Sequence, residues 1–113
     1  MINNFTNLKE FSVSEISLSI KKHIENEFTL VKVIGELGRI SKPSSGHIYF
    51  DMKDERSSLS CVVWRNTLKD QEEFLEEGSE VIALGRITTF SGQSRYQLVA
   101  VSYTHLRAHE TSI

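Results

Sequence analysis

Two aromatic rings lie close together near the middle of the 113-residue chain, beside positively charged side chains. His47 and Tyr49 are two residues apart in a segment whose apolar residues occupy the alternate positions, so we expect both rings on the outward face of one β-strand. Lys53 ends the same segment, and Lys42 lies in the loop before it. Such a combination suits single-stranded nucleic acid, because bases stack on rings and phosphates pair with cations. The alternative is that Tyr49 only packs against a neighbouring strand.

Further rings and cations lie in two other places. Trp64 is out of phase with the apolar residues of its own strand, which favours the ligand side, but Val62 shares its phase, so a core position fits equally well. Phe90 flanks a turn where small Greek-key barrels place a ligand-contacting loop, and Arg86 and Arg95 could pair with phosphates there or simply be solvated. The predicted nucleic-acid-binding residues are therefore Lys42, His47, Tyr49, Lys53, Trp64, Arg65, Arg86, Phe90 and Arg95.

No catalytic constellation accompanies these residues. The chain has no P-loop, no G-x-S-x-G elbow and no paired cysteines. Acidic residues gather between positions 70 and 77, but we expect them on a solvated helix without a second set of ligands, so they do not indicate a metal site. The sequence predicts a binding module with no catalytic residue, no metal and no cofactor.

Positive charge is gathered in part of the chain, although the formal net charge is −2. Residues 31–65 carry six Lys or Arg against four acids, and residues 81–100 carry two Arg and no acid. Residues 66–80 carry one Lys against six acids. Such a division lets one face attract phosphate while the total charge stays negative.

The remaining pattern predicts the elements that would position these residues. Ser12 and Glu15 form a capping box at the start of an amphipathic helix that ends near residue 26, and its apolar stripe is expected to cover one end of a sheet. Five strand-like segments follow, with a helical segment at 66–77 between the third and the fourth; the strands are expected at 30–34, 47–53, 59–65, 81–89 and 95–100. This order predicts an all-β domain with an N-terminal helix, a five-stranded OB-fold Greek-key barrel. Gly35 and Gly85, inside two of the strands, suit a strongly bent sheet.

The compartment is predicted from what the sequence lacks. The single cysteine, Cys61, has no partner for an internal disulfide. No signal peptide and no apolar run of membrane-spanning length are present. These features predict a cytoplasmic protein that does not associate with membranes.

The last part of the chain differs from the rest. Residues 101–111 resemble one reading frame of a transposase adapter that is used to prepare DNA sequencing libraries. On that resemblance the natural sequence ends near residue 100, and His105 and His109 are excluded as a metal pair. We therefore expect a helix packing on the barrel at 1–28, the nucleic-acid-binding barrel at 29–100 and a non-native tail at 101–113.

Several segments together resemble one family, the large subunit of exodeoxyribonuclease VII. Gly-His-Ile-Tyr-Phe-Asp-Met-Lys-Asp at 46–54 is similar to the family's second-strand signature. Other similar segments stand in the family's order and spacing, at 11–15, 33–37, 60–65, 77–81 and 96–99. The departures are mild: Trp64 stands where smaller aromatic residues are common, and Met52 replaces the usual leucine.

The resemblance implies an N-terminal OB domain that binds single-stranded DNA for a nuclease that degrades it to short oligonucleotides. It also implies that the catalytic domain, and the helical region that recruits the small subunit, lie beyond this chain. The chain alone is therefore predicted to be inactive as a nuclease. Two alternatives remain open: an anticodon-binding OB domain of a class II aminoacyl-tRNA synthetase, which would bind RNA, and an OB barrel used only for protein docking.

Overall fold

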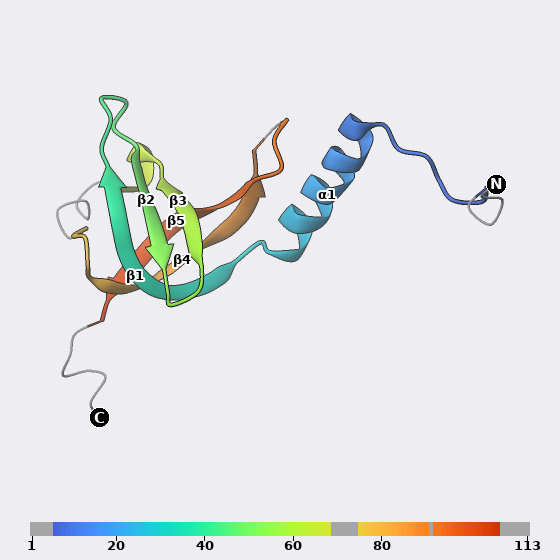
Figure 1. Ribbon diagram of the computed structural model, residues 1–113. Helices are drawn as coiled ribbons and strands as arrows, with labels where there is room; N and C mark the ends of the chain where they lie inside the picture. The colour runs from blue at the N-terminus through green and yellow to red at the C-terminus, as the bar shows by residue number, and fades with distance from the viewer. Residues whose placement is uncertain (1–5, 69–74, 91, 107–113) are drawn as a thin grey trace.

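The computed structural model describes residues 6–68, 75–90 and 92–106. Two helices and five strands lie within them: α1 (Val13–Glu27), β1 (Val31–Ser41), β2 (Ile48–Lys53), β3 (Ser58–Val63), α2 (Arg65–Leu68), β4 (Glu80–Thr89) and β5 (Tyr96–His105). The strands pair in the order β1-β2-β3-β5-β4, and β4 returns to β1 to close the barrel (Figure 1). This arrangement confirms the predicted five-stranded OB-fold barrel with an N-terminal helix.

Alternate side chains fill the barrel interior, as the period of two along a strand requires. On β2, Ile48, Phe50 and Met52 are buried in the core, whereas Tyr49 between them faces outward. Cys61 on β3 and Leu98 on β5 are directly paired and both belong to the same core cluster. The predicted alternation of β2 is therefore confirmed, and it fixes which residues of this strand are free to meet a ligand.

Two irregularities bend the barrel wall. The register of β4 against β5 shifts between Leu84 and Gly85, and a Cβ atom at Gly85 would collide with the carbonyl oxygen of Val99. The close approach of two backbones explains why a glycine stands there. In β1 the register against β2 shifts between Leu37 and Ile40. The sequence suggested an irregularity at Gly35, so the observed one lies a few residues later.

β3 ends two residues earlier than expected, so Trp64 and Arg65 lie beyond it, and three further elements differ more from the sequence prediction. β1 runs to Ser41 because its first half pairs with β4 and its second half pairs with β2. β5 runs to His105, five residues beyond the predicted strand end, and pairs with β4 as far as Val81. Helix α2 begins one residue before the helix expected at 66–77 and is described as far as Leu68; residues 69–74 lie outside the described residues, and Leu75 is buried in the core.

Helix α1 begins with the predicted capping box. The backbone N–H of Ser12 donates to the Glu15 carboxylate over 2.7 Å, and the backbone N–H of Glu15 donates to the Ser12 hydroxyl over 3.0 Å. The helix then projects away from the barrel and approaches β4 with its C-terminal half (Figure 1). None of its residues is buried, Val13 is 82% exposed, and within the apolar stripe only Ile24 is half-buried, so the barrel covers less of the stripe than the sequence suggested. Neither helix in the described part of the chain is long and apolar enough to cross a membrane.

Candidate nucleic-acid interface

His47 and Trp64 form an aromatic pair where β2 begins and β3 ends. Their ring centroids lie 4.9 Å apart and their planes are inclined at 77°, so the edge of one ring meets the face of the other. Nδ1 of His47 also accepts a hydrogen bond of 3.0 Å from the backbone N–H of Arg65. His47 therefore holds the end of β3 in place, and the pair does not offer two free stacking surfaces. Trp64 is half-buried, so it lies between the core position and the ligand-facing position that its sequence phase allowed.

The Arg65 side chain crosses the loop between β1 and β2. Its Nη1 donates to the carbonyl oxygen of Ser45 over 3.3 Å, while the residue remains exposed. Gly46 has a positive φ of 90°, and a Cβ atom there would lie 2.9 Å from Cδ of Arg65. The glycine thus gives the turn its conformation and leaves room for the arginine stem. Lys42, in the same loop, is exposed.

Tyr49 lies in a row of outward positions that crosses the barrel wall. It pairs with Val62 on β3, Val62 pairs with Val99 on β5, and Val99 pairs with Arg86 on β4. Tyr49 is 41% exposed and Arg86 is exposed, but Val62 and Val99 between them are buried. The outer surface is therefore open at the two ends of this row and covered in the middle.

A second group of predicted residues lies at the hairpin between β4 and β5. The guanidinium carbon of Arg95 stands 4.9 Å from the ring centroid of Phe90, within cation–π distance. The backbone N–H of Phe90 donates to the carbonyl oxygen of Arg95 over 3.0 Å and closes the hairpin. The Arg95 guanidinium also reaches the Gln93 side chain at 3.5 Å. Arg95 is exposed above the ring, where a phosphate can reach it.

Glu25 on helix α1 lies near positive charges from its own helix and from Arg86 on β4. The pKa of the Glu25 carboxyl lies below its usual value, mainly because Lys21 donates a hydrogen bond of 2.7 Å to it. The amide of Thr89 and the positive charges of Lys21 and Arg86 act in the same direction. Glu25 therefore stays ionised and offsets part of the positive charge at this edge of the barrel.

Lys53 does not join either group. It lies at the opposite end of β2 from His47, and its Nζ atom is 4.0 Å from the carboxylate of Glu36 on β1. Both side chains are about half exposed, so this contact is weak in water. Among the nine predicted residues, His47, Trp64 and Arg65 contact one another, and Phe90 and Arg95 contact each other.

The two groups are carried by loops that project from the same side of the barrel. Figure 1 shows the connection between β1 and β2 and the hairpin between β4 and β5 at this side, with α1 beside the hairpin. Polynucleotides are bound by these two loops and by the face of the second and third strands in OB-folds. The structure therefore brings most of the predicted residues to the side where such a ligand would lie.

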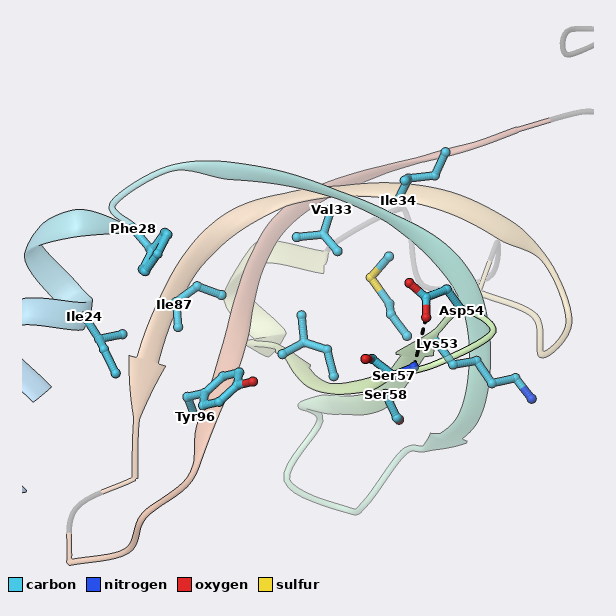
Figure 2. Close-up of a pocket in the computed structure, with 12 residues that line it drawn as sticks. Ile24, Phe28, Val33, Ile34, Lys53, Asp54, Ser57, Ser58, Ile87 and Tyr96 are labelled. Carbon is cyan, nitrogen blue, oxygen red and sulfur yellow. Dashed lines mark hydrogen bonds between the residues drawn. The ribbon is translucent and has the colours of Figure 1, made fainter. Parts of the chain in front are cut away.

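Two hollows include residues that the sequence reasoning left out of the site. A cavity of about 430 Å³ opens at the end of the barrel, where it is lined by Ile24, Phe28 and Tyr96 together with Val33 and Ile87, which pack against the core (Figure 2). A groove of about 550 Å³ lies between α1 and the hairpin of β4 and β5. The amphipathic stripe of α1 was visible in the sequence, but its position beside the hairpin was not.

The described residues offer groups that can bind a ligand. No cluster of three or more His, Cys, Asp or Glu residues among them could hold a metal ion. Most of the acidic cluster noted in the sequence falls at 69–74, outside the residues that the structure describes. Burial raises the pKa of the Cys61 thiol to about 12, so this sulfur is not a nucleophile at neutral pH. Rings and cations remain, and these can stack on bases and pair with phosphates.

The chain resembles known proteins in sequence and in fold. Residues 11–103 match the family model described as an OB-fold nucleic acid binding domain. The chain is 50% identical over 93 residues to the exodeoxyribonuclease 7 large subunit of Cereibacter sphaeroides, which covers 82% of this chain and 18% of that protein. It is also 50% identical over 98 residues to the same subunit of Agrobacterium fabrum, with 86% and 18% covered. The chain thus spans less than a fifth of the length of these relatives.

Solved structures of lower identity share the fold. Asparaginyl-tRNA synthetase from Pyrococcus horikoshii superposes with a TM-score of 0.62 at 14% identity, over 89% of this chain and 23% of that chain. A chain of the S. pombe Stn1-ten1 complex superposes with a TM-score of 0.55 at 20% identity, over 73% of this chain and 61% of that chain. These likenesses concern the barrel alone.

Proposed function

The chain belongs to the family of OB-fold nucleic acid binding domains, and from this premise we propose that it binds single-stranded DNA. The arrangement of rings and cations on two loops at one side of the barrel supports the proposal most directly. Tyr49 supplies an exposed ring beside the first loop, and Arg95 stands over Phe90 on the second. Single strands are bound by such stacking surfaces beside positive charge, with little need for a fixed sequence.

The choice of DNA over RNA rests on the relatives. The proteins that are 50% identical to this chain are named exodeoxyribonuclease subunits, and the name places their action on DNA. The tRNA synthetases share only the fold, at 14–17% identity. The chain itself is proposed to hold the strand for a catalytic domain that lies outside it, and the exodeoxyribonuclease small subunit is proposed as a partner of that longer protein. This work is proposed to take place in the cytoplasm.

A titration with three labelled oligonucleotides tests the proposal. Poly-dT of about 20 nucleotides, the matching RNA and duplex DNA are compared by fluorescence anisotropy at two salt concentrations. We expect the DNA single strand to bind best, and its affinity to fall as salt rises because phosphate contacts release counterions. Stronger binding of the RNA would support the tRNA-like alternative. Equal binding of duplex, or no binding of any strand, would contradict the proposal.

Tyr49 gives the sharper form of this test. Replacing Tyr49 by alanine removes the exposed ring, and we expect single-strand affinity to fall about tenfold, since one stacked base contributes roughly 1–3 kcal/mol. Replacing it by phenylalanine keeps the ring and should keep most of the affinity. Both variants should melt like the parent, because the side chain faces outward. If both variants bind like the parent, the ligand does not stack on this face.

A further inference from the structure

The groove between α1 and the β4–β5 hairpin has two walls of different character. Ser14, Ser17 and Lys21 contribute to the helix wall, together with the apolar residues on the same side of α1. Phe90, Arg95 and Tyr96 contribute to the hairpin wall, together with the turn residues from Gly92 to Ser94. At about 550 Å³ the groove falls within the size of sites that take small organic groups, about 300–1,000 Å³. It is therefore large enough for part of a nucleotide chain.

The lining of the groove contains two cationic side chains, one of which is paired with a carboxylate just outside it. Lys21 on the helix and Arg95 on the hairpin line it, and no carboxylate is among its lining residues. The nearest acid along the helix, Glu25, is held by Lys21 and by the backbone N–H of Thr89 and lies outside the lining. Lys21 is therefore already paired, and Arg95, with no carboxylate beside it in the lining, favours an anionic ligand.

The groove also offers groups that suit bases and sugars. Tyr96 is 60% exposed, and Phe90 also lines the hairpin wall of the groove. Hydroxyls of Ser14, Ser17 and Ser94 line the same space and can donate to phosphate or sugar oxygens. Tyr96 and Ile24 also line the cavity in Figure 2, so the two hollows share a boundary.

We propose that this groove binds nucleotides of the same single strand that crosses the barrel, so that α1 is a second wall of the DNA site. The inference rests on the proposed function and extends it from the barrel to the helix. It accounts for the helix that stands beside the hairpin with most of its apolar stripe uncovered. Phe90 and Arg95 belong both to the predicted binding residues of the hairpin and to the lining of the groove. A DNA strand that passes the hairpin therefore continues into the groove.

A pair of matched variants on α1 tests the proposal. Ser17→Glu places a negative charge in the groove lining, whereas Ser19→Glu makes the same change two residues away, about 200° around the helix and outside the lining. Affinities are measured for dT oligonucleotides of about 6 and about 20 nucleotides. For Ser17→Glu we expect the longer oligonucleotide to bind about three- to tenfold more weakly, because phosphates would meet a like charge. Ser19→Glu should bind both lengths like the parent.

A second measurement needs no variant. Backbone amide signals of Ser14, Ser17 and Leu18 are followed by NMR while the longer oligonucleotide is added to the parent chain, and we expect them to shift together with those of the hairpin. Equal affinities of the two glutamate variants for the longer strand, with silent helix amides, would overturn the groove proposal and leave a protein segment as the alternative occupant. If Tyr49→Ala still weakens binding in that case, only the groove proposal falls. If the parent binds neither oligonucleotide, the proposed function falls with it.

Discussion

The Cys61 thiol faces the barrel interior, where the side chain is 2% exposed. Its Sγ atom approaches the carbonyl oxygen of Leu59 at 3.4 Å, and burial raises its pKa to about 12. Burial penalises the thiolate because the charged form loses its hydration. The residue therefore acts as a small apolar side chain in the wall of the core.

This environment predicts slow labelling and a stability that falls at high pH. A thiol reagent should react with the folded chain much more slowly than with the chain in denaturant, because only the unfolded thiol is accessible as a thiolate. Since the folded pKa of about 12 lies above the reference value of 9.0, the folded state keeps its proton while the unfolded state loses it. The contribution to stability is complete below about pH 9 and is lost progressively between 9 and 12. Urea titrations from pH 7 to 11 measure it.

The alanine variant at this position is the control for that measurement. Cys61→Ala should lose the part of the pH dependence that belongs to the thiol, although its stability at pH 7 should fall because of the smaller side chain. Rapid labelling of the native protein, or an unchanged pH slope in the variant, would show that Cys61 is not held as described.

His47 illustrates what residue-by-residue reading of a sequence can and cannot predict. Alternation with Ile48 and Phe50 predicted an outward position on the second strand, and in the structure His47 lies one residue before β2 and is half-buried. Its contacts with Trp64 and with the backbone of Arg65 depend on the pairing of β2 with β3, which no local pattern specifies. Local alternation therefore predicts which side of a strand a side chain faces, but it does not predict which residues that side chain will contact.

At the scale of elements, the same division explains the helices. The capping box predicted the start of α1, because its two hydrogen bonds involve residues three positions apart. The position of α1 is set by distant contacts: Lys21 donates to the carbonyl oxygen of Thr89 over 3.1 Å, and the backbone N–H of Ile87 donates to the carbonyl oxygen of Phe28 over 3.0 Å. An amphipathic stripe predicts that a helix has an apolar side, but it does not predict what that side will meet.

The bend in β4 carries a prediction at this scale. Gly85→Ala would press a methyl group against the backbone of Val99 and Ala100, where the nearest Cα atom would be 2.9 Å away. The two strands would have to separate, so we expect a loss of about 1–3 kcal/mol in the free energy of unfolding. Gly38→Ala is the matched control, since its Cβ would meet Asp51 at an ordinary 3.5 Å. Urea denaturation of both variants decides the matter, and equal midpoints would mean that the β4–β5 approach is not as close as described.

At the scale of the whole molecule, folding and ligand binding depend on different parts of the protein. The core is made by side chains from all five strands and by Leu75, and none of its members comes from α1. The helix is joined to the barrel through Lys21, Glu25 and the strand end at Thr89, with Ile24 half-buried nearby. Folding should therefore depend on the barrel alone, whereas binding of a long strand should depend on both.

Removal of residues 1–27 separates these two roles. The shortened chain keeps Phe28, whose carbonyl oxygen accepts from Ile87, and loses only partly exposed contacts. We expect the free energy of unfolding to change by about 1 kcal/mol or less, since exposed ion pairs contribute little. Affinity for the longer dT strand should fall at least as far as in Ser17→Glu, because the whole helix wall of the groove is gone. Affinity for the short strand should stay near that of the full chain, because the surface around Tyr49 is intact. A shortened chain that fails to fold would show instead that α1 belongs to the core, and one that binds the longer strand unchanged would remove the helix from the DNA site.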